Sequence, residues 1–416
     1  MQKRNIFDDI MVCLLLFMQM GFHTNSGYDD TICLLVTGGI FLYFAFCKGN
    51  RGLIHFSRAS KEYIIWYTSV TSFCCASYFW ATNSNIVMIR DLVINTYVPL
   101  MLTVFCLVEY TRKKQDGINL LVVFIYAEIF VAVRALMNTP MVELLTSFNT
   151  RVYGTGLGVN YNHFTTQYAL AFCVALFLSF SHKKKYYWHL GFILLNIVLS
   201  GSRKVLIVSL ICFIIIYVMS AKRDDMIEKF KRVIAVTILL VAVFWVVMTN
   251  EFLYQLIGQK TYAFISQFFS YTINELDYSY YQRSTLIEIA RSVFVNNPIV
   301  GVGYYCFIYY NQWGVYAHNN YYELLADLGI IGFILYYWFY FKQLWVALLK
   351  SDSKHIIYTV SKHNTLVVAF IITLMIMEYG HVSFFRPYVL TPLLVMYLAV
   401  DNMRKNNKNN ISKKEV

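Results

Sequence analysis

Apolar stretches recur along the chain from one end to the other, with short polar segments between them. Each is close to the length that an α-helix needs to cross the hydrocarbon core of a bilayer, about 20 residues. Gly201 and Ser202 provide the only break between two neighbouring stretches near the middle. The pattern predicts about twelve membrane-spanning helices, at residues 6–22, 31–47, 63–80, 91–109, 118–137, 163–181, 187–201, 203–220, 233–249, 321–341, 364–381 and 387–402.

Composition places the chain among membrane proteins. Of its 416 residues 58% are hydrophobic and 14% are charged, whereas soluble domains carry about 25% charged residues. We therefore expect an all-α integral membrane protein, with one polytopic domain over residues 1–403 and a disordered cytoplasmic tail at residues 404–416. The nine cysteines lie mostly within apolar runs and form no CxxC pair, which favours buried side chains over a disulfide or metal role.

The net charge is +12, and the positions of the basic residues along the chain predict an orientation in the membrane. Lysine and arginine gather in alternate segments, such as residues 112–114, 183–185 and 222–232, and in the C-terminal tail. Cytoplasmic loops of membrane proteins carry this excess of basic residues. We expect both termini to be cytoplasmic, and we expect no role in binding nucleic acid.

One predicted external segment, residues 250–320, is much longer than the other loops. Long loops within compact proteins are usually functional. Residues 282–294 within it have helical periodicity, with Leu286, Ile289 and Val293 on one face. Pro298 is expected to end this helix.

The stretch Asn297–Gly332 reads NPIVGVGYYCFIYYNQWGVYAHNNYYELLADLGIIG. A turn with Gly301 and Gly303 precedes His318 and two asparagines, which stand at the mouth of a predicted membrane helix. Ionisable residues are costly inside a membrane, so Glu323 and Asp327 near the start of this helix require an explanation.

Arginines are scarce on the predicted external side. Arg151 precedes the sixth span, Arg203 begins the eighth, and Arg283 opens the helix of the long segment. A guanidinium group stays charged and presents a fork of donors that matches phosphate oxygens. The alternative is that each arginine only extends toward lipid headgroups from a helix end.

His318 suits general-base work, because an unperturbed imidazole has a pKa near 6.5; the alternative is a structural residue at the start of a helix, bonded to Asn319 or Asn320. Glu323 and Asp327 are spaced i, i+4 and share a helix face. They are an alternative base, partners for Arg203 or Arg283, or a structural ion pair.

Within the fifth span, Glu128 and Arg134 are expected to pair structurally, either with each other or with another span. A role in binding lipid phosphate is the second reading. The many tyrosines, Tyr281 among them, either stack on sugar rings or form the aromatic belt of the membrane interface.

Three segments resemble the O-antigen ligase and polymerase superfamily of membrane glycosyltransferases. SGSRKVLIVSL at residues 200–210 is similar to a helix start of that superfamily, RSTLIEIARSVFVNNPIVGVGYYCF at 283–307 to its loop helix and glycine turn, and AHNNYYELLADLGIIG at 317–332 to its histidine segment. An aromatic residue often follows the loop arginine in that family, whereas Ile287 and Glu288 occupy the region here.

The resemblance implies a fold similar to the glycosyltransferase C class. It implies a polymerase that joins polyprenyl-pyrophosphate-linked oligosaccharide units at the outer face of the bacterial cytoplasmic membrane, with inversion and without metal or other cofactor. Catalytic roles are implied for Arg203, Arg283 and His318, and we expect substrate binding by the set Arg151, Asn319, Glu323 and Tyr281. The expected partners are the lipid-linked donor and acceptor, the bilayer, a chain-length regulator and a flippase.

Two other functions stay open at this point. A ligase would transfer the finished glycan to a lipid or protein acceptor and would break the same sugar–phosphate bond. A lipid-linked oligosaccharide transporter would show repeats and broken helices at mid-membrane, whereas the polar groups here gather on one side.

Overall fold

The computed structural model describes residues 6–22, 27–47, 56–114, 117–140, 153–157, 161–181, 186–220, 226–251, 254, 278–349 and 357–412. Arg151 and most of the long segment between residues 251 and 278 lie outside these ranges, so the predictions made for them stay predictions. The described ranges contain helices and turns but no strand.

A helix covers each of the twelve predicted apolar stretches. The helices are α1 (Ile6–Gly21), α2 (Gly27–Leu42), α3 (Arg58–Ala76), α4 (Ile86–Asp91), α5 (Val98–Lys114), α6 (Gly117–Met137), α8 (Tyr161–Ser181), α9 (Tyr187–Leu199), α10 (Arg203–Met219), α11 (Met226–Thr249), α14 (Tyr278–Asn296), α15 (Asn320–Leu349), α16 (Ile357–Glu378) and α17 (Pro387–Ser412). A π-helical segment, Leu92–Tyr97, joins α4 to α5. The predicted break at Gly201 separates α9 from α10, and Gly201 there has φ of 64°.

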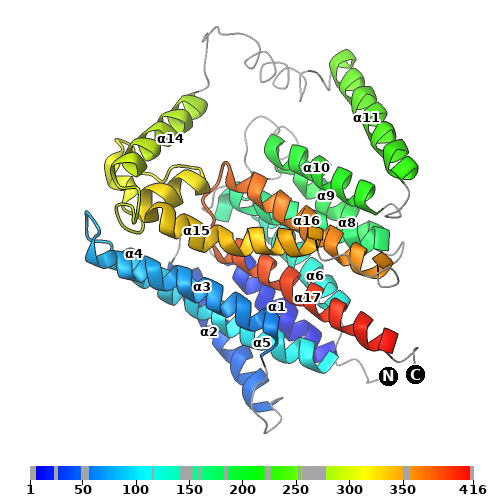
Figure 1. Ribbon diagram of the computed structural model, residues 1–416, viewed down its shortest axis with the longest axis horizontal. Helices are drawn as coiled ribbons and strands as arrows, with labels where there is room; N and C mark the ends of the chain where they lie inside the picture. The colour runs from blue at the N-terminus through cyan, green and yellow to red at the C-terminus, as the bar shows by residue number, and fades with distance from the viewer. Residues whose placement is uncertain are drawn as a thin grey trace.

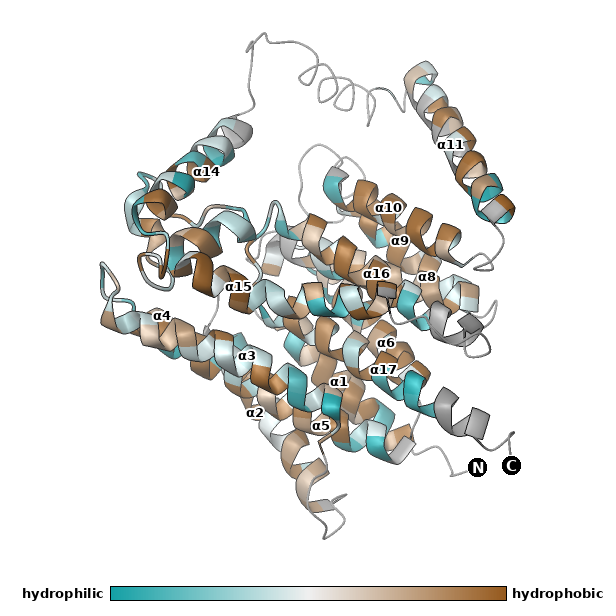
Figure 2. Cartoon of the chain, viewed as in Figure 1, coloured by the Kyte–Doolittle hydropathy of each residue, from teal (hydrophilic) through white to brown (hydrophobic). Residues whose placement is uncertain are grey.

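Five helical stretches in the described ranges are long and apolar enough to cross a membrane, and three shorter apolar helices accompany them. The five are Asp29–Phe46, Ile86–Arg112, Gly117–Met137, Phe164–Ser181 and Asn320–Leu348. The all-α membrane protein is thereby supported, whereas twelve crossings stay a prediction. Brown, hydrophobic residues dominate the middle of the bundle, and teal, hydrophilic residues are frequent on α14 and in the turns that precede α15 (Figure 2).

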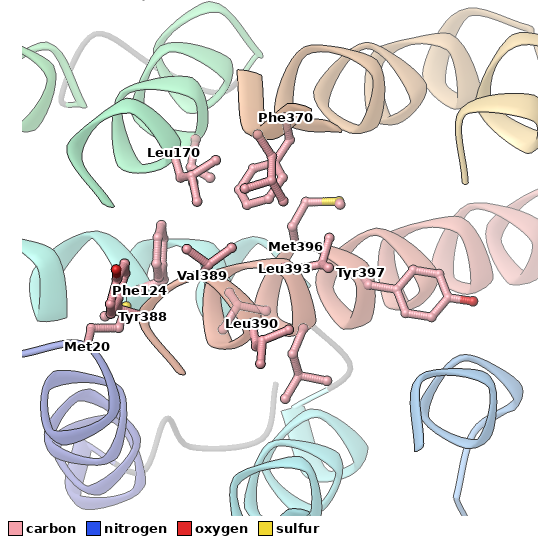
Figure 3. Packing of buried hydrophobic residues seen from close by; sticks show 14 of the residues in the cluster. Met20, Phe124, Leu170, Phe370, Tyr388, Val389, Leu390, Leu393, Met396 and Tyr397 are labelled. Carbon is pink, nitrogen blue, oxygen red and sulfur yellow. The ribbon is translucent and has the colours of Figure 1, made fainter. Parts of the chain in front are cut away.

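Helix α17 lies in the centre of the bundle, against α1, α5, α6 and α16. Its Val389, Leu390 and Leu393 are fully buried. Figure 3 shows Val389 beside Phe124 of α6, whereas Leu390 points away from Phe370 of α16. The start of α1 and the end of α17 lie at one end of the bundle, and α14 with the turn before α15 lies at the other (Figure 1). This arrangement fits termini on one side of the membrane; which side stays a prediction.

The end of α17 differs from the sequence-based expectation. Residues 404–412, predicted to be part of a disordered tail, continue the helix to Ser412. The Arg404 guanidinium donates to the Asn364 side chain at 2.6 Å, and Lys405 pairs with Asp401 one turn back at 2.5 Å. These contacts give the polar residues partners along the helix, which composition alone does not reveal.

Arg134 and Glu128 do not pair with each other. The Arg134 guanidinium instead donates to Asp29 of α2 at 3.3 Å and to the carbonyl oxygen of Gly21. Residues six apart lie on different faces of a helix, so the pairing with another span is the one that geometry permits.

The glycine turn and helix α15 are joined by backbone hydrogen bonds, which we call the backbone clasp (residues 298–303 with residues 326–331). The N–H groups of Val302 and Gly303 donate to the carbonyls of Ala326 and Asp327 at 3.0 and 2.8 Å. In the opposite direction, the N–H of Ile330 donates to the carbonyl of Pro298 at 2.9 Å. In the clasp, the turn thus donates backbone hydrogen bonds to the helix and also accepts them from it.

Two glycines make the clasp possible. Gly329 interrupts α15 with φ of 62° and ψ of −166°, which frees backbone groups of the helix for the turn. A Cβ atom on Gly329 would lie 2.4 Å from the carbonyl carbon of Ile299, and one on Gly301 would lie 2.4 Å from that of Asp327. Both positions also need left-handed backbone, which glycine adopts without strain.

The clasp fixes α14 against the start of α15. Leu286, Ala290 and Val293 of α14 form a small core with apolar residues of the turn and of α15, among them Val302 and Ala326. The predicted helix of residues 282–294 and its apolar face are thus confirmed, and the helix ends before Pro298 as expected.

We expect Gly301→Ala and Gly329→Ala to lower the melting temperature of the purified protein in detergent. The left-handed backbone alone costs a non-glycine residue about 1–2 kcal/mol, and the overlap with the facing backbone adds to this. Gly191→Ala in α9 is the matched control, because nothing lies within 4 Å of its Cβ position. Melting temperatures of the first two variants equal to that of the control would contradict the clasp.

Candidate functional site

The two asparagines at the mouth of α15 connect it to the turn between α16 and α17. The Asn319 side chain accepts N–H groups of Tyr321 and Tyr322 at 3.0 and 3.3 Å and donates to the carbonyl of Tyr379 at 3.1 Å. It therefore caps the helix. Its buried amide has a structural role here, and its predicted contact with substrate stays a prediction.

Asn320 links the same two regions. Its side-chain oxygen accepts the N–H groups of Ser383 and Phe384 at 2.9 and 3.2 Å, and its amide donates to the Tyr337 hydroxyl at 2.9 Å. The α16–α17 turn, residues 379–386, is thereby held against the start of α15.

His318 lies directly before these asparagines, in a left-handed backbone conformation with φ of 53°. This conformation costs a non-glycine residue about 1–3 kcal/mol and is often found at functional sites. The half-buried imidazole packs against the Tyr316 ring, with centroids 4.3 Å apart. Within the described part of the chain, no hydrogen bond to its ring nitrogens is found, so the interaction expected with Asn319 or Asn320 is not observed.

Burial, together with the smaller effect of the positive charge of Arg283, lowers the pKa of His318 to about 4. The imidazole is therefore neutral at pH 7. A neutral imidazole without an internal partner is able to accept a proton from a bound hydroxyl group.

Glu323 and Asp327 bind backbone rather than arginine. One Glu323 carboxylate oxygen accepts a hydrogen bond at 2.5 Å from the N–H of Ala317, the residue directly before His318. The other carboxylate oxygen has no hydrogen-bond partner among the described residues. Both Asp327 oxygens accept backbone N–H groups, from Tyr305 and Phe307, at 2.8 Å each. In the described residues neither carboxylate forms an ion pair with an arginine, so a structural role in holding the turn is the one observed.

Arg283 lies on α14, half-buried, at the end of the bundle that carries His318. It interacts electrostatically with His318, Tyr316 and Lys204. Among the residues that the structure places, it has no ion-pair partner. The clasp positions α14 and thereby places the unpaired guanidinium of Arg283 within electrostatic range of the His318 imidazole.

Helix α10 brings the second predicted arginine to the same end. Arg203 is its first residue, although its side chain is outside the described part. The next residue, Lys204, donates to the carbonyl of Met377 at the end of α16 and interacts electrostatically with Arg283. The start of α10 therefore lies beside the end of α16 and within electrostatic range of Arg283 on α14.

Two other residues, Tyr281 and Arg151, are predicted to bind substrate, and within the described part of the chain no hydrogen bond joins the Tyr281 side chain to Arg283 or His318. Tyr281 is 51% exposed and lies two residues before Arg283. Arg151 is outside the described ranges, so its placement stays a prediction.

The α16–α17 turn contributes residues that the sequence analysis did not single out. Glu378 at its start is buried and accepts hydroxyl hydrogen bonds from Tyr336, Tyr337, Tyr340 and Ser383, at 2.6–3.1 Å. Arg386 is the last residue of the turn. The signal available in the sequence is the segment EYGHVSFFRPY, in which charged and polar residues are interspersed between two apolar spans.

A separate cavity of about 220 Å³ lies at the opposite end of α10. It is lined by Ser220, Arg232 and aromatic residues such as Tyr217. The Arg232 guanidinium is already bonded to Glu228, to Ser220 at 2.9 Å and to the carbonyl of Tyr217 at 2.8 Å. Its donors are thus occupied, unlike those of Arg283.

Comparison with known proteins gives a family for this region. Residues 188–337 match the profile of the family described as O-Antigen ligase. The match extends from α9 into α15 and includes Arg203, Arg283 and His318. The match supports the predicted resemblance of this region to the O-antigen ligase and polymerase superfamily, whose members are glycosyltransferase-like enzymes. No curated protein matches the chain.

Proposed function

We propose that this protein is a polysaccharide polymerase of the O-antigen ligase and polymerase superfamily. It joins oligosaccharide units carried on polyprenyl pyrophosphate at the outer face of the bacterial cytoplasmic membrane. The observation that carries the proposal is the approach of the unpaired Arg283 to the neutral His318 at the mouth of α15.

In the proposed reaction, a sugar hydroxyl of the acceptor attacks the anomeric carbon of the donor. His318 accepts the hydroxyl proton, a new glycosidic C–O bond forms, and the bond from the anomeric carbon to the pyrophosphate oxygen breaks with inversion. The electron pair leaves with the polyprenyl pyrophosphate, whose charge Arg283 and Arg203 stabilise. Fixed positive groups aimed at developing charge are often the largest contribution to catalysis.

The substrate also prepares the base in this mechanism. Burial and, to a smaller extent, the positive charge of Arg283 make His318 a weak base in the free protein. A bound pyrophosphate offsets that charge and raises the pKa of the imidazole toward the range in which general bases work well. The base therefore strengthens only when the donor is bound.

A ligase is the second candidate, because the matched family is described as O-Antigen ligase. It would break the same bond with the same residues and differ only in the acceptor. The chain-length regulator and the flippase expected as partners belong to the polymerase proposal.

Arg203→Ala, Arg283→Ala and His318→Ala are expected to fail to restore long polymer in a strain that lacks the gene. Loss of a positioned general base costs about 10²–10⁴ in rate. Arg291→Ala is the matched control, because Arg291 is exposed on the same helix as Arg283. Polymer length is measured by gel electrophoresis at equal expression of all variants.

The products in the deletion strain separate the candidates. Single units on the carrier indicate a polymerase, and long chains that stay on the carrier indicate a ligase. Units that accumulate on the cytoplasmic side indicate a transporter. Long polymer in cells with His318→Ala would contradict the role of His318.

The pH dependence of kcat/KM tests the electrostatics of the base. This quantity reports the free protein, so the proton-free form of His318 should persist until the pH falls to about 4. We expect kcat/KM to stay level from pH 8 to pH 5, where an imidazole of ordinary pKa would retain only about 3% of its free base. The substrate for this measurement is lipid-linked oligosaccharide extracted from the deletion strain.

Arg283→Gln removes the neighbouring positive charge, so its residual activity should decline at a higher pH than that of the wild type. Arg291→Gln should leave the profile unchanged. An acid limb near pH 6.5 in the wild-type protein would show that the imidazole is not perturbed as described.

A further inference from the structure

Arg386 is the last residue of the α16–α17 turn, directly before Pro387 begins α17. Its guanidinium carbon lies 4.5 Å from the centroid of the Phe385 ring. This contact fixes the direction of the side chain and covers one face of the group. The Nε atom is buried and has no hydrogen-bond partner.

The guanidinium also lacks a carboxylate partner among the described residues. A buried charge or donor without a partner is costly, and in a native protein it requires an explanation. By contrast, Arg134, Arg232 and Arg404 each bind an acceptor on a neighbouring helix or turn. Arg386 thus resembles Arg283 in keeping its donors free.

Three tyrosines lie within electrostatic range of Arg386. Arg386 interacts electrostatically with Tyr305 of the glycine turn, with Tyr316 beside His318 and with Tyr388 of α17. Arg283 acts on Tyr316 as well. Tyr316 is therefore within the field of two guanidinium groups that come from different elements, α14 and the α16–α17 turn.

The carboxylates nearby do not neutralise Arg386. Glu323 acts on Tyr305 and Tyr316, which places it in the same cluster, but it forms no salt bridge with Arg386 and uses one oxygen to bind Ala317. Asp327 uses both oxygens to bind backbone N–H groups. The cluster therefore keeps two guanidinium groups available for a ligand of opposite charge.

We propose that Arg386, together with Tyr316, binds an anionic group of the lipid-linked substrate, at a position separate from that of Arg283. The ligand is a phosphate or a sugar carboxylate, since the guanidinium fork matches the oxygens of both. The inference rests on the proposed function. A polymerase binds two lipid-linked substrates at once. A phosphate or a sugar carboxylate of the second substrate is therefore available to bind at a second anion position.

The test uses the full-length protein in lipid nanodiscs and two probes. Farnesyl pyrophosphate represents the carrier headgroup, and tetragalacturonic acid represents an acidic sugar chain without lipid. Affinities of both probes are measured for the wild type, Arg386→Gln, Arg386→Lys and Arg283→Gln. Arg291→Gln, at an exposed position of α14, is the control for loss of a charge.

Arg386→Gln is expected to weaken binding of at least one probe by about tenfold or more without a change in melting temperature, as expected for loss of a charge-assisted bond. A loss confined to farnesyl pyrophosphate identifies a phosphate as the ligand, and a loss confined to tetragalacturonic acid identifies a sugar carboxylate. Should the glutamine variant not fold, Arg386→Lys, which keeps the charge but not the fork, must still weaken binding.

The result that overturns the inference is binding of both probes by the Arg386 variants as tightly as by the wild type. If Arg283→Gln nevertheless loses farnesyl pyrophosphate, the proposed function stands and only the role of Arg386 fails. If Arg283→Gln also binds farnesyl pyrophosphate normally, or if the wild type binds neither probe, the proposed function fails with it.

Discussion

The exchange of backbone hydrogen bonds between the glycine turn and the interrupted helix α15 is the constraint on which the rest of the site depends. Gly329 breaks the helix, and the freed groups bind the turn at residues 298–303. Because α14 leads directly into that turn, the same bonds fix where Arg283 lies. A glycine motif without any reactive group thus decides the geometry of the proposed catalytic site.

Polar groups buried in a membrane protein must find partners, and most of those at this end of the bundle do so. Asn319 and Asn320 use their amides to join α15 to the α16–α17 turn, and Glu378 accepts the hydroxyls of three tyrosines and a serine. These contacts reduce the cost of burial and make the turn rigid. Among the described residues Arg283, His318 and Arg386, like one oxygen of Glu323, lack an internal hydrogen-bond partner for a side-chain group, and we propose that the first three act on the substrate.

Much of the fold follows from the sequence, because apolar stretches of membrane length and single breaks such as Gly201 are local signals. The apolar face of residues 282–294 is likewise a local pattern, and the small core around Leu286 confirms it. The choice of Arg283 and His318 came from resemblance and order along the chain. Their approach to each other depends on the clasp, which joins residues about 28 apart in sequence.

The contacts that were missed are those made between distant elements. The i, i+4 spacing places Glu323 and Asp327 on one face but cannot show that backbone N–H groups, not arginines, are their partners. Helices α15 and α16 lie between His318 and Arg386 in the sequence. Only the packing of these helices brings Arg386 within electrostatic range of Tyr316. The helical continuation at residues 404–412 depends on contacts such as Arg404 with Asn364, which composition cannot reveal.

The most direct measurement is a cryo-electron microscopy map of the protein with a bound prenyl pyrophosphate in nanodiscs. The account predicts density for the phosphates beside Arg283 at the mouth of α15, within reach of the His318 imidazole. Phosphate density at the opposite end of α10, in the cavity that Arg232 and Ser220 line, would contradict it.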